Sequence, residues 1–308
     1  LCGRAVSRHL RYYEGYHRPL GIVLDLLGIE EYLNPLLKED IKMLNIVVCV
    51  KAVPDPKEAC NIKIDPDTKT LLRCDVPLVL NPLDKNAMEA ALQLKTQFEA
   101  HISVLSMGPP EAGNIVKECL ALGADQGFLL SDPAFGGADA FATAFTLAKG
   151  IEKIGSFDVV FCGMASSDGS TEWVGPEIAT FLDLPVVTLV KEIVDCDGAS
   201  WKVKASVENG YRLMQVELPA VFTVTREVNT PRTLSFSGII KARKKEIEQW
   251  GINELGVTHE TVGLKGSPTI VSELNAQEEN KRQAEMISGT RDEKADVLVQ
   301  KLVDAGVL

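Results

Sequence analysis

Residues 161–178, which read FCGMASSDGSTEWVGPEI, hold the side chains of this chain best suited to binding a phosphate-bearing ligand. A short apolar run precedes them, and apolar residues at helical spacing follow, so we predict a buried strand, a small polar loop and a helix start. Gly163 and Gly169 would let a ligand approach the backbone closely. Ser170 or Thr171 could cap the helix, whose free N–H groups would then face a phosphate or pyrophosphate. An ordinary strand-to-helix turn is the alternative for this loop taken alone.

Three other segments are expected at the same place. Residues 49–52 and 107–108 follow apolar runs that we interpret as buried strands, and residues 81–84 form a helix start in which Asn81 could cap and Asp84 would favour the positive end of the dipole. Ligands of doubly wound sheets bind at the carboxyl ends of the strands. Each segment alone is better explained by structure, but their convergence predicts a nucleotide pocket.

The elements that must position this pocket alternate between strand and helix. We predict strands within residues 45–50, 102–107, 127–130 and 157–162 and a further strand beginning in 183–188, separated by helices within 82–94, 115–122, 138–154 and 174–182. Residues 62–64 and 70–72 flank the turn 66–69 and indicate a hairpin. The fold class is therefore α/β, with a doubly wound, mostly parallel sheet.

The pattern changes after residue 188. Residues 189–195, 201–207, 211–218 and 220–225 alternate as antiparallel strands do, with Asp197-Gly198 and Asn209-Gly210 as tight-turn dipeptides, so we predict an appended antiparallel β-meander. Residues 226–243 indicate an exposed loop that enters a short helix carrying the basic run 241–245. That run is either a solvated face or, beside an exposed Phe236, a protein-docking patch. Residues 246–272 read as extended with turns, and 275–302 as a charged, helix-rich tail.

These patterns divide the chain into four parts. We expect residues 1–42 to be an extension foreign to the native domain, a translation artefact or a fusion remnant, with Met43 at or near the natural start; a helical arm packed on the domain is the alternative. Residues 43–230 would form the nucleotide-binding α/β domain with its β-meander. Residues 231–245 would be an exposed loop with a short basic helix, and 246–308 a C-terminal arm.

Composition excludes several classes of protein. The net charge of −11 argues against nucleic acid as the main partner, and no apolar run is long enough to span a bilayer. The seven cysteines are scattered and form no CxxC pair, and the four histidines have no ligand spacing, so we expect no disulfide framework, no metal site and a cytoplasmic location.

Several ordered motifs make the chain resemble the β subunit of electron transfer flavoproteins over residues 43–308. They are VKAVP at 50–54, VLNPLD at 79–84, SMGP at 106–109, LGAD at 122–125, DGST at 168–171, VENGY at 207–211 and ELPAV at 217–221. The resemblance implies an adenine nucleotide alpha hydrolase-like fold in which residues 43–230 bind a nucleotide or flavin and residues 231–245 recognise a partner. It further implies a heterodimer with an α subunit, which the C-terminal arm would contact and which holds an FAD of its own. It also implies no catalytic residue in this chain, with Asp168 and Glu172 as cap or ribose contacts.

Carried over by motif, the resemblance implies a cofactor pocket and a recognition site. The pocket would consist of Cys49, Asn81, Pro82, Leu83, Asp84, Met107, Gly163, Met164, Ala165, Ser166, Ser167, Asp168, Gly169, Ser170, Thr171, Glu172, Trp173 and Val174. The recognition site, which clamps a dehydrogenase, would consist of Leu234, Phe236 and Ile239. Cys49 departs from the alanine of many members.

The loop with its DGST motif most resembles the electron-bifurcating members, although many of those have Asp where this chain has Ser170. Such a member holds FAD in the β-subunit pocket, accepts hydride from NADH and splits the electrons. One goes to ferredoxin or flavodoxin, and the other passes through the α-subunit FAD to a flavin dehydrogenase such as an acyl-CoA dehydrogenase. The alternatives are a non-bifurcating β subunit that holds AMP and a stand-alone adenine-nucleotide-binding protein of the universal-stress type.

Overall fold

The computed structural model describes residues 43–57, 63–64, 71–72, 76–196, 199–271 and 284–307. The described residues fall into two compact units: 43–57 with 76–270, and a smaller unit made of 63–64, 71–72 and the part of the chain from 271 onward. Residues 1–42, the turn at 66–69 and the dipeptide Asp197-Gly198, on which the sequence makes predictions, lie outside the described residues.

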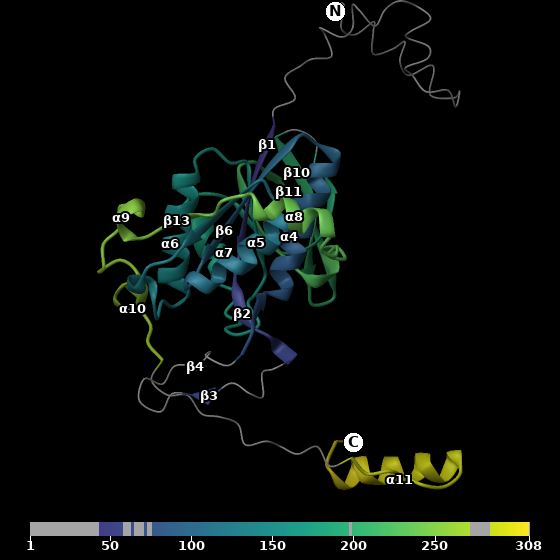
Figure 1. Cartoon of the computed structure of the whole chain (residues 1–308). Coiled ribbons are helices and arrows are strands. Elements are labelled where there is room, and N and C mark those ends of the chain that lie inside the picture. The colour runs from purple at the N-terminus through teal and green to yellow at the C-terminus, as the bar shows by residue number, and fades with distance from the viewer. Residues whose placement is uncertain are drawn as a thin grey trace, which may run out of the picture. The chain divides into compact units, whose positions relative to one another are not determined.

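The larger unit is built on a nine-stranded sheet in the order β11-β10-β9-β12-β8-β1-β6-β7-β13 (Figure 1). Its strands are β1 Leu44–Val50, β6 Ala100–Met107, β7 Gln126–Leu130, β8 Val159–Gly163, β9 Val186–Asp195, β10 Ser200–Val207, β11 Gly210–Glu217, β12 Ala220–Val224 and β13 Glu248–Trp250. In this sheet order, β9-β10 and β10-β11 pair antiparallel. All the other neighbouring strands, from β9 and β12 across to β7 and β13, pair parallel. The predicted α/β class with a mostly parallel sheet is confirmed.

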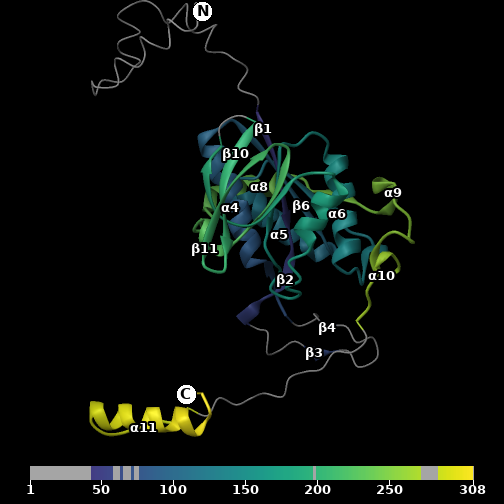
Figure 2. The same cartoon turned by 180° about the vertical axis from the view of Figure 1, so that it is seen from behind.

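Helices cover both faces of this sheet (Figure 2). They are α4 Pro82–Gln97, α5 Gly113–Leu122, α6 Ala140–Ile154, α7 Val174–Phe181 and α8 Phe236–Arg243, with single 3₁₀ turns at Pro110–Ala112, Pro133–Phe135 and Arg226–Val228. Successive residues of β1 alternate between two cores: Ile46 and Val48 pack towards α4 and α5, whereas Val47 and Cys49 pack towards α6 and α7. Burial on both faces explains why β1 reads as an unbroken apolar run.

Short elements complete the described chain. Two antiparallel pairs lie outside the main sheet, namely β2 Ala52–Pro54 with β5 Leu78–Leu80, and β3 Lys63–Ile64 with β4 Leu71–Leu72 as the predicted hairpin. After β13 come α9 Ile252–Leu255 and α10 Gly263–Gly266, and α11 Arg291–Asp304 belongs to the smaller unit. The sequence did not predict β13, which joins the sheet edge by pairing with β7 and by packing Trp250 on Phe128, with ring centroids 4.6 Å apart.

The predicted β-meander is wrong in its last strand. β12 does not continue the antiparallel series but lies parallel between β8 and β9, in the middle of the sheet. All five of its residues are buried, because a central strand is covered on both faces. Phe222 there stacks on Trp201, with ring centroids 5.5 Å apart, and lies 5.7 Å from the ring of Phe161.

The predicted break at residue 188 is also absent. One strand, β9, runs through it, pairing with β12 in parallel and then with β10 in antiparallel fashion. Leu189 adopts a left-handed backbone with φ of 57°, and its N–H donates to the Thr223 hydroxyl over 3.1 Å. The pairing with β12 shifts register at this point, so the sequence pattern changes where the strand bulges rather than where it ends.

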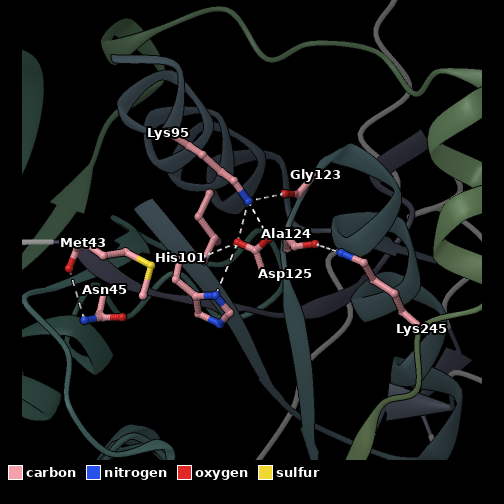
Figure 3. Close-up of polar contacts among 9 residues, drawn as sticks. Met43, Asn45, Lys95, His101, Gly123, Ala124, Asp125 and Lys245 are labelled. Atoms are coloured by element: carbon pink, nitrogen blue, oxygen red, sulfur yellow. Dashed lines mark hydrogen bonds and ion pairs between the residues drawn. The ribbon is translucent and has the colours of Figure 1, made fainter. Parts of the chain in front are cut away.

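A polar cluster around Asp125 joins α4 to the amino ends of β6 and β7 (Figure 3). The Asp125 carboxylate accepts hydrogen bonds from Lys95 Nζ, at 2.6 Å, and from the Ile102 N–H, at 2.8 Å. Burial opposes ionisation, but these two donors prevail and lower the pKa of Asp125. Lys245, from the predicted basic run, donates to the carbonyl of Ala124 and so serves this cluster within the fold.

None of the described helices is both long enough and apolar enough to cross a membrane.

The aromatic cluster around β12 yields a stability prediction. Phe222→Ala should lower the unfolding free energy by about 3–5 kcal/mol, because the ring is fully buried and its removal leaves a cavity. Leu213→Ala is the control, since that side chain on β11 is 58 % exposed; its effect should stay within about 0.5 kcal/mol. Denaturant unfolding of the purified protein measures both. Equal losses in the two variants would show that β12 is not a core strand.

Candidate functional site

The structure brings most of the predicted pocket residues together at the carboxyl tips of β1, β6 and β8. The helix start 81–84 and the loop 163–168 are joined by direct hydrogen bonds. Met107 ends β6, the strand that pairs with β1. Cys49 is an exception, because its side chain is buried in the core towards α6 and α7 together with Cys162. A residue at a strand tip can thus point into the core instead of towards a ligand.

Asp84 connects the two central strand tips. One carboxylate oxygen accepts the Lys51 N–H at 2.8 Å, and the other accepts the Gly163 N–H at 3.0 Å. The residue is only 6 % exposed, so it lies under the pocket loop and does not line an open cavity. Burial raises the pKa of Asp84 to about 7, although the two backbone donors and the Asn81 side chain act in the opposite direction. The sequence predicted that Asp84 favours the positive end of the helix dipole. Its main interaction is instead this pair of hydrogen bonds, which joins the backbone N–H groups of two strand tips and is called the Asp84 bracket below.

Asn81 holds the pocket loop rather than capping its own helix. It occupies the N-cap position of α4, yet its side chain makes no capping hydrogen bond. Instead its amide donates to the Ala165 carbonyl over 2.9 Å and accepts from the Ser167 N–H over 3.1 Å. The predicted cap is therefore wrong, because the side chain bonds backbone groups of a neighbouring loop instead.

Lys51 is a site residue that the sequence prediction missed. Its ammonium lies 2.6 Å from Asp168 Oδ1 and 3.3 Å from the Ser166 hydroxyl. The Asp168 side chain is 8 % exposed and that of Lys51 is 42 % exposed, so the carboxylate is covered while the cation stays open to solvent. The sequence analysis placed residues 49–52 at the strand tips but did not name Lys51 among the pocket residues.

The loop before α7 is held in an unusual backbone conformation. Ser170 and Glu172 have φ of 49° and 61°, which side-chain-bearing residues seldom adopt and which cluster at ligand clamps. The Ser170 hydroxyl donates to the Ser166 carbonyl at 3.0 Å. The N-cap of α7 is Trp173, without a side-chain capping bond, so the predicted cap by Ser170 or Thr171 is wrong.

The predicted pocket residue Gly163 and the nearby Gly175 are both required by packing. A Cβ at Gly163 would lie 2.5 Å from Asp84 Oδ1, and one at Gly175 would lie 2.3 Å from Thr223 Cγ2. Gly169 differs, because its nearest neighbour would be the Ser166 hydroxyl at 3.3 Å. The space for a ligand is therefore offered by the exposed part of the loop around Gly169 and not by Gly163.

The exposed part of the loop determines what the site can do. Residue 167 and residues 169–173 are solvent-exposed, and the Trp173 indole is 63 % exposed. Small hydroxyl-bearing residues, a lysine and an indole can bind phosphate oxygens and stack on a planar ring. The covered carboxylates of Asp84 and Asp168 are both engaged by donors, so neither is placed to act as an acid or base on a ligand.

The predicted recognition residues lie on and just before α8. Phe236 begins this helix and is 80 % exposed, while Leu234 and Ile239 are 42 % and 37 % exposed. Ser235 caps the helix by accepting the Gly238 N–H at 3.1 Å. A hollow of about 230 Å³ adjoins this segment, lined by Lys85, Glu89, Leu92, Glu118, Leu122, Pro231, Arg232, Thr233 and Leu234. Among its lining residues only Leu234 belongs to either predicted site.

Comparison with known proteins identifies the relatives of this chain. The electron transfer flavoprotein domain model matches residues 68–255. The chain is 46 % identical over 259 residues to the electron transfer flavoprotein subunit beta of Clostridium acetobutylicum, covering 84 % of this chain and 98 % of that protein. It is 43 % identical over 267 residues to the caffeyl-CoA reductase-Etf complex subunit CarD of Acetobacterium woodii, covering 86 % and 100 %. Protein FixA of Azotobacter vinelandii is 38 % identical over 250 residues, covering 79 % and 88 %.

The buried Asp84 predicts a pH dependence of stability. Its pKa is raised to about 7 from 3.8, so between these values the folded state holds a proton that the unfolded state has lost. The unfolding free energy should therefore fall as the pH rises from about 4 to about 7, by up to about 1.4 kcal/mol per pH unit, and then level off. Asp84→Asn lacks this titration, so the wild-type-minus-variant difference should show the slope in denaturant unfolding.

Asp125→Asn is the matched control for this titration. The pKa of Asp125 is lowered, so its stabilising contribution is lost only in more acidic solution, as the pH falls through that pKa. Its wild-type-minus-variant difference should be flat between about pH 5 and about pH 7. A flat difference for Asp84→Asn as well would contradict the assignment of a proton to the folded-state carboxyl.

Proposed function

Because the chain belongs to the electron transfer flavoprotein family as a beta subunit, we propose that it holds FAD at the tips of β1, β6 and β8 in a heterodimer with an α subunit. The observation that carries the proposal is the Asp84 and Asn81 hydrogen-bond set. It ties the start of α4 to residues 163–167 and so presents the loop that follows to solvent. Doubly wound sheets bind ligands in this position.

The chemistry of the loop suits a dinucleotide. Lys51 and the hydroxyls of Ser170 and Thr171 would face phosphate oxygens, and Trp173 would stack on a ring. Asp168 is neutralised by Lys51, which reduces the repulsion that a second phosphate would meet. The positive-φ residues Ser170 and Glu172 give the loop a defined shape before a ligand arrives.

The redox step itself belongs to the cofactor. A bound FAD would supply the chemistry that takes hydride from NADH and passes single electrons to ferredoxin or flavodoxin and, through the α subunit, to a flavin dehydrogenase. The chain contributes position and electrostatics. The relative whose name includes caffeyl-CoA reductase supports a dehydrogenase of the acyl-CoA type as the electron partner.

We place the docking of that dehydrogenase at Leu234, Phe236 and Ile239. An aromatic side chain that is 80 % exposed and surrounded by small polar residues is typical of an interface hot spot. The segment begins ten residues after β12, whose last residue, Val224, accepts the N–H of Met164 in the pocket loop over 2.9 Å. Leu234 and the start of α8 lie beside the C-terminal end of α5, next to Leu122 and Ala121, so the docking site is separate from the pocket loop. The scattered cysteines support a cytoplasmic location for the complex.

A beta subunit that holds AMP in the same pocket and does not bifurcate is the second candidate. The same loop would fit its single phosphate. Extraction of cofactors from the co-expressed heterodimer distinguishes the two: we expect about two FAD per heterodimer, whereas one FAD with one AMP would establish the second candidate. The alternative of a stand-alone stress-type nucleotide binder is wrong, because the family model and the relatives that match this chain are those of electron transfer flavoproteins.

Substitutions should separate the two predicted sites. Phe236→Ala should raise the KM for the heterodimer in a dehydrogenase-coupled assay by about tenfold or more while flavin content stays unchanged, because a hot-spot side chain is lost. Asp168→Ala and Thr171→Val should lower flavin content and leave that KM unchanged in the molecules that retain flavin. Loss of flavin from Phe236→Ala would refute the division between docking loop and pocket.

A further inference from the structure

Glu89, on the second turn of α4, is a buried carboxylate that pairs with Arg232 from a loop distant in the sequence. Arg232 Nε lies 2.7 Å from Glu89 Oε2, and Arg232 Nη2 lies 3.0 Å from Oε1. The Arg232 backbone N–H also donates to Oε2, at 3.1 Å. The Glu89 side chain is 6 % exposed and that of Arg232 is 39 % exposed. This fork holds both the side chain and the backbone of the loop residue.

A second tie lies one helical turn away on the same helix. The Asn86 amide donates to the Asn229 carbonyl at 3.0 Å and to its side-chain oxygen at 3.1 Å. The Asn229 amide donates back to the Asn86 carbonyl at 2.9 Å. Positions 86 and 89 of α4 thus hold positions 229 and 232 of the loop, with the same spacing of three residues on each side.

We propose that Glu89 is a positioning residue for partner docking: by clamping Arg232 it fixes the loop from which Phe236 projects. The inference rests on the docking role proposed above for Phe236. Only four positions separate Arg232 from Phe236, and the residues between them have exposed side chains. A clamp at Arg232 therefore limits how far the start of α8 can move, and it reduces the conformational entropy lost on docking.

The arrangement argues for a loop-positioning role over a general stabilising one. Replacing a buried ion pair by apolar residues is often neutral or stabilising, so stability alone gives little reason for an arginine fork here. The hollow beside the fork is lined by Leu92 and Leu122, which could have covered an apolar loop residue instead. The fork supplies a fixed direction to the loop, which an apolar contact would not.

The test uses the co-expressed heterodimer and an acyl-CoA dehydrogenase chosen because it exchanges electrons with the wild-type protein. Arg232→Gln should raise the KM for the heterodimer about tenfold and leave kcat and flavin content unchanged. It should also speed chymotrypsin cleavage at Leu234 and Phe236, because the released loop fits the protease more readily. Arg232→Lys, which keeps the charge but cannot form the fork, should recover only part of the effect.

Lys85→Gln is the matched control. Lys85 lines the same hollow from α4 but pairs with Glu118 of α5 at 3.4 Å, so this variant removes an ion pair without touching the loop. It should leave KM and cleavage unchanged. Glu89→Gln combined with Arg232→Gln should be no worse than either alone, since both remove the same contact.

The outcomes distinguish the two proposals. An unchanged KM for Arg232→Gln, with a raised KM for Phe236→Ala, would overturn the positioning role and leave the docking site intact. An unchanged KM for Phe236→Ala would overturn the docking site itself. Loss of flavin from Arg232→Gln would overturn the inference by showing that the fork supports the whole fold.

Discussion

The bracket that Asp84 forms between Lys51 and Gly163 is the interaction on which the site depends. Two neighbouring parallel strands end at the same level, and each leaves a backbone N–H without a strand partner. A single carboxylate satisfies both, and a buried N–H left alone would cost about 1–3 kcal/mol. Burying the Asp84 charge is itself unfavourable, which is why the pKa of Asp84 is raised. The bracket persists because leaving the two strand-tip N–H groups without an acceptor would be worse.

Helix α4 carries this bracket and three further polar ties on the side that faces the protein. Asn81, Asp84, Asn86 and Glu89 are all buried, and each is satisfied by a segment far away in the sequence. Their apolar neighbours on α4 pack into the core. Because buried polar groups must be paired, the helix dictates where those loops can lie.

The sequence was most informative where burial alone decides the structure. The apolar run before residue 51 and the glycine at 123, which ends α5 with φ of 133°, predicted their elements because the pattern is local. It failed at β12, since a fully apolar strand reads the same whether its neighbours run parallel or antiparallel. It failed again at Asn81, where a cap was the local expectation but a distant loop competed for the side chain, and at Ser170, whose hydroxyl donates to the Ser166 carbonyl instead. The link between Lys51 and Asp168 spans 117 positions, which no local pattern reveals.

The central position of β12 links the two proposed sites through one strand. Its Thr223 packs against Gly175 at the start of α7, and its Val224 accepts a hydrogen bond from the pocket loop. Ten positions separate Val224 from Leu234, and the chain between them follows α4, where Asn229 pairs with Asn86 and Arg232 pairs with Glu89. The start of α8 then lies beside Ala121, at the C-terminal end of α5. The parallel insertion of β12 thus starts this segment at the carboxyl tips of the sheet, and the polar residues of α4 hold its course from there to α8.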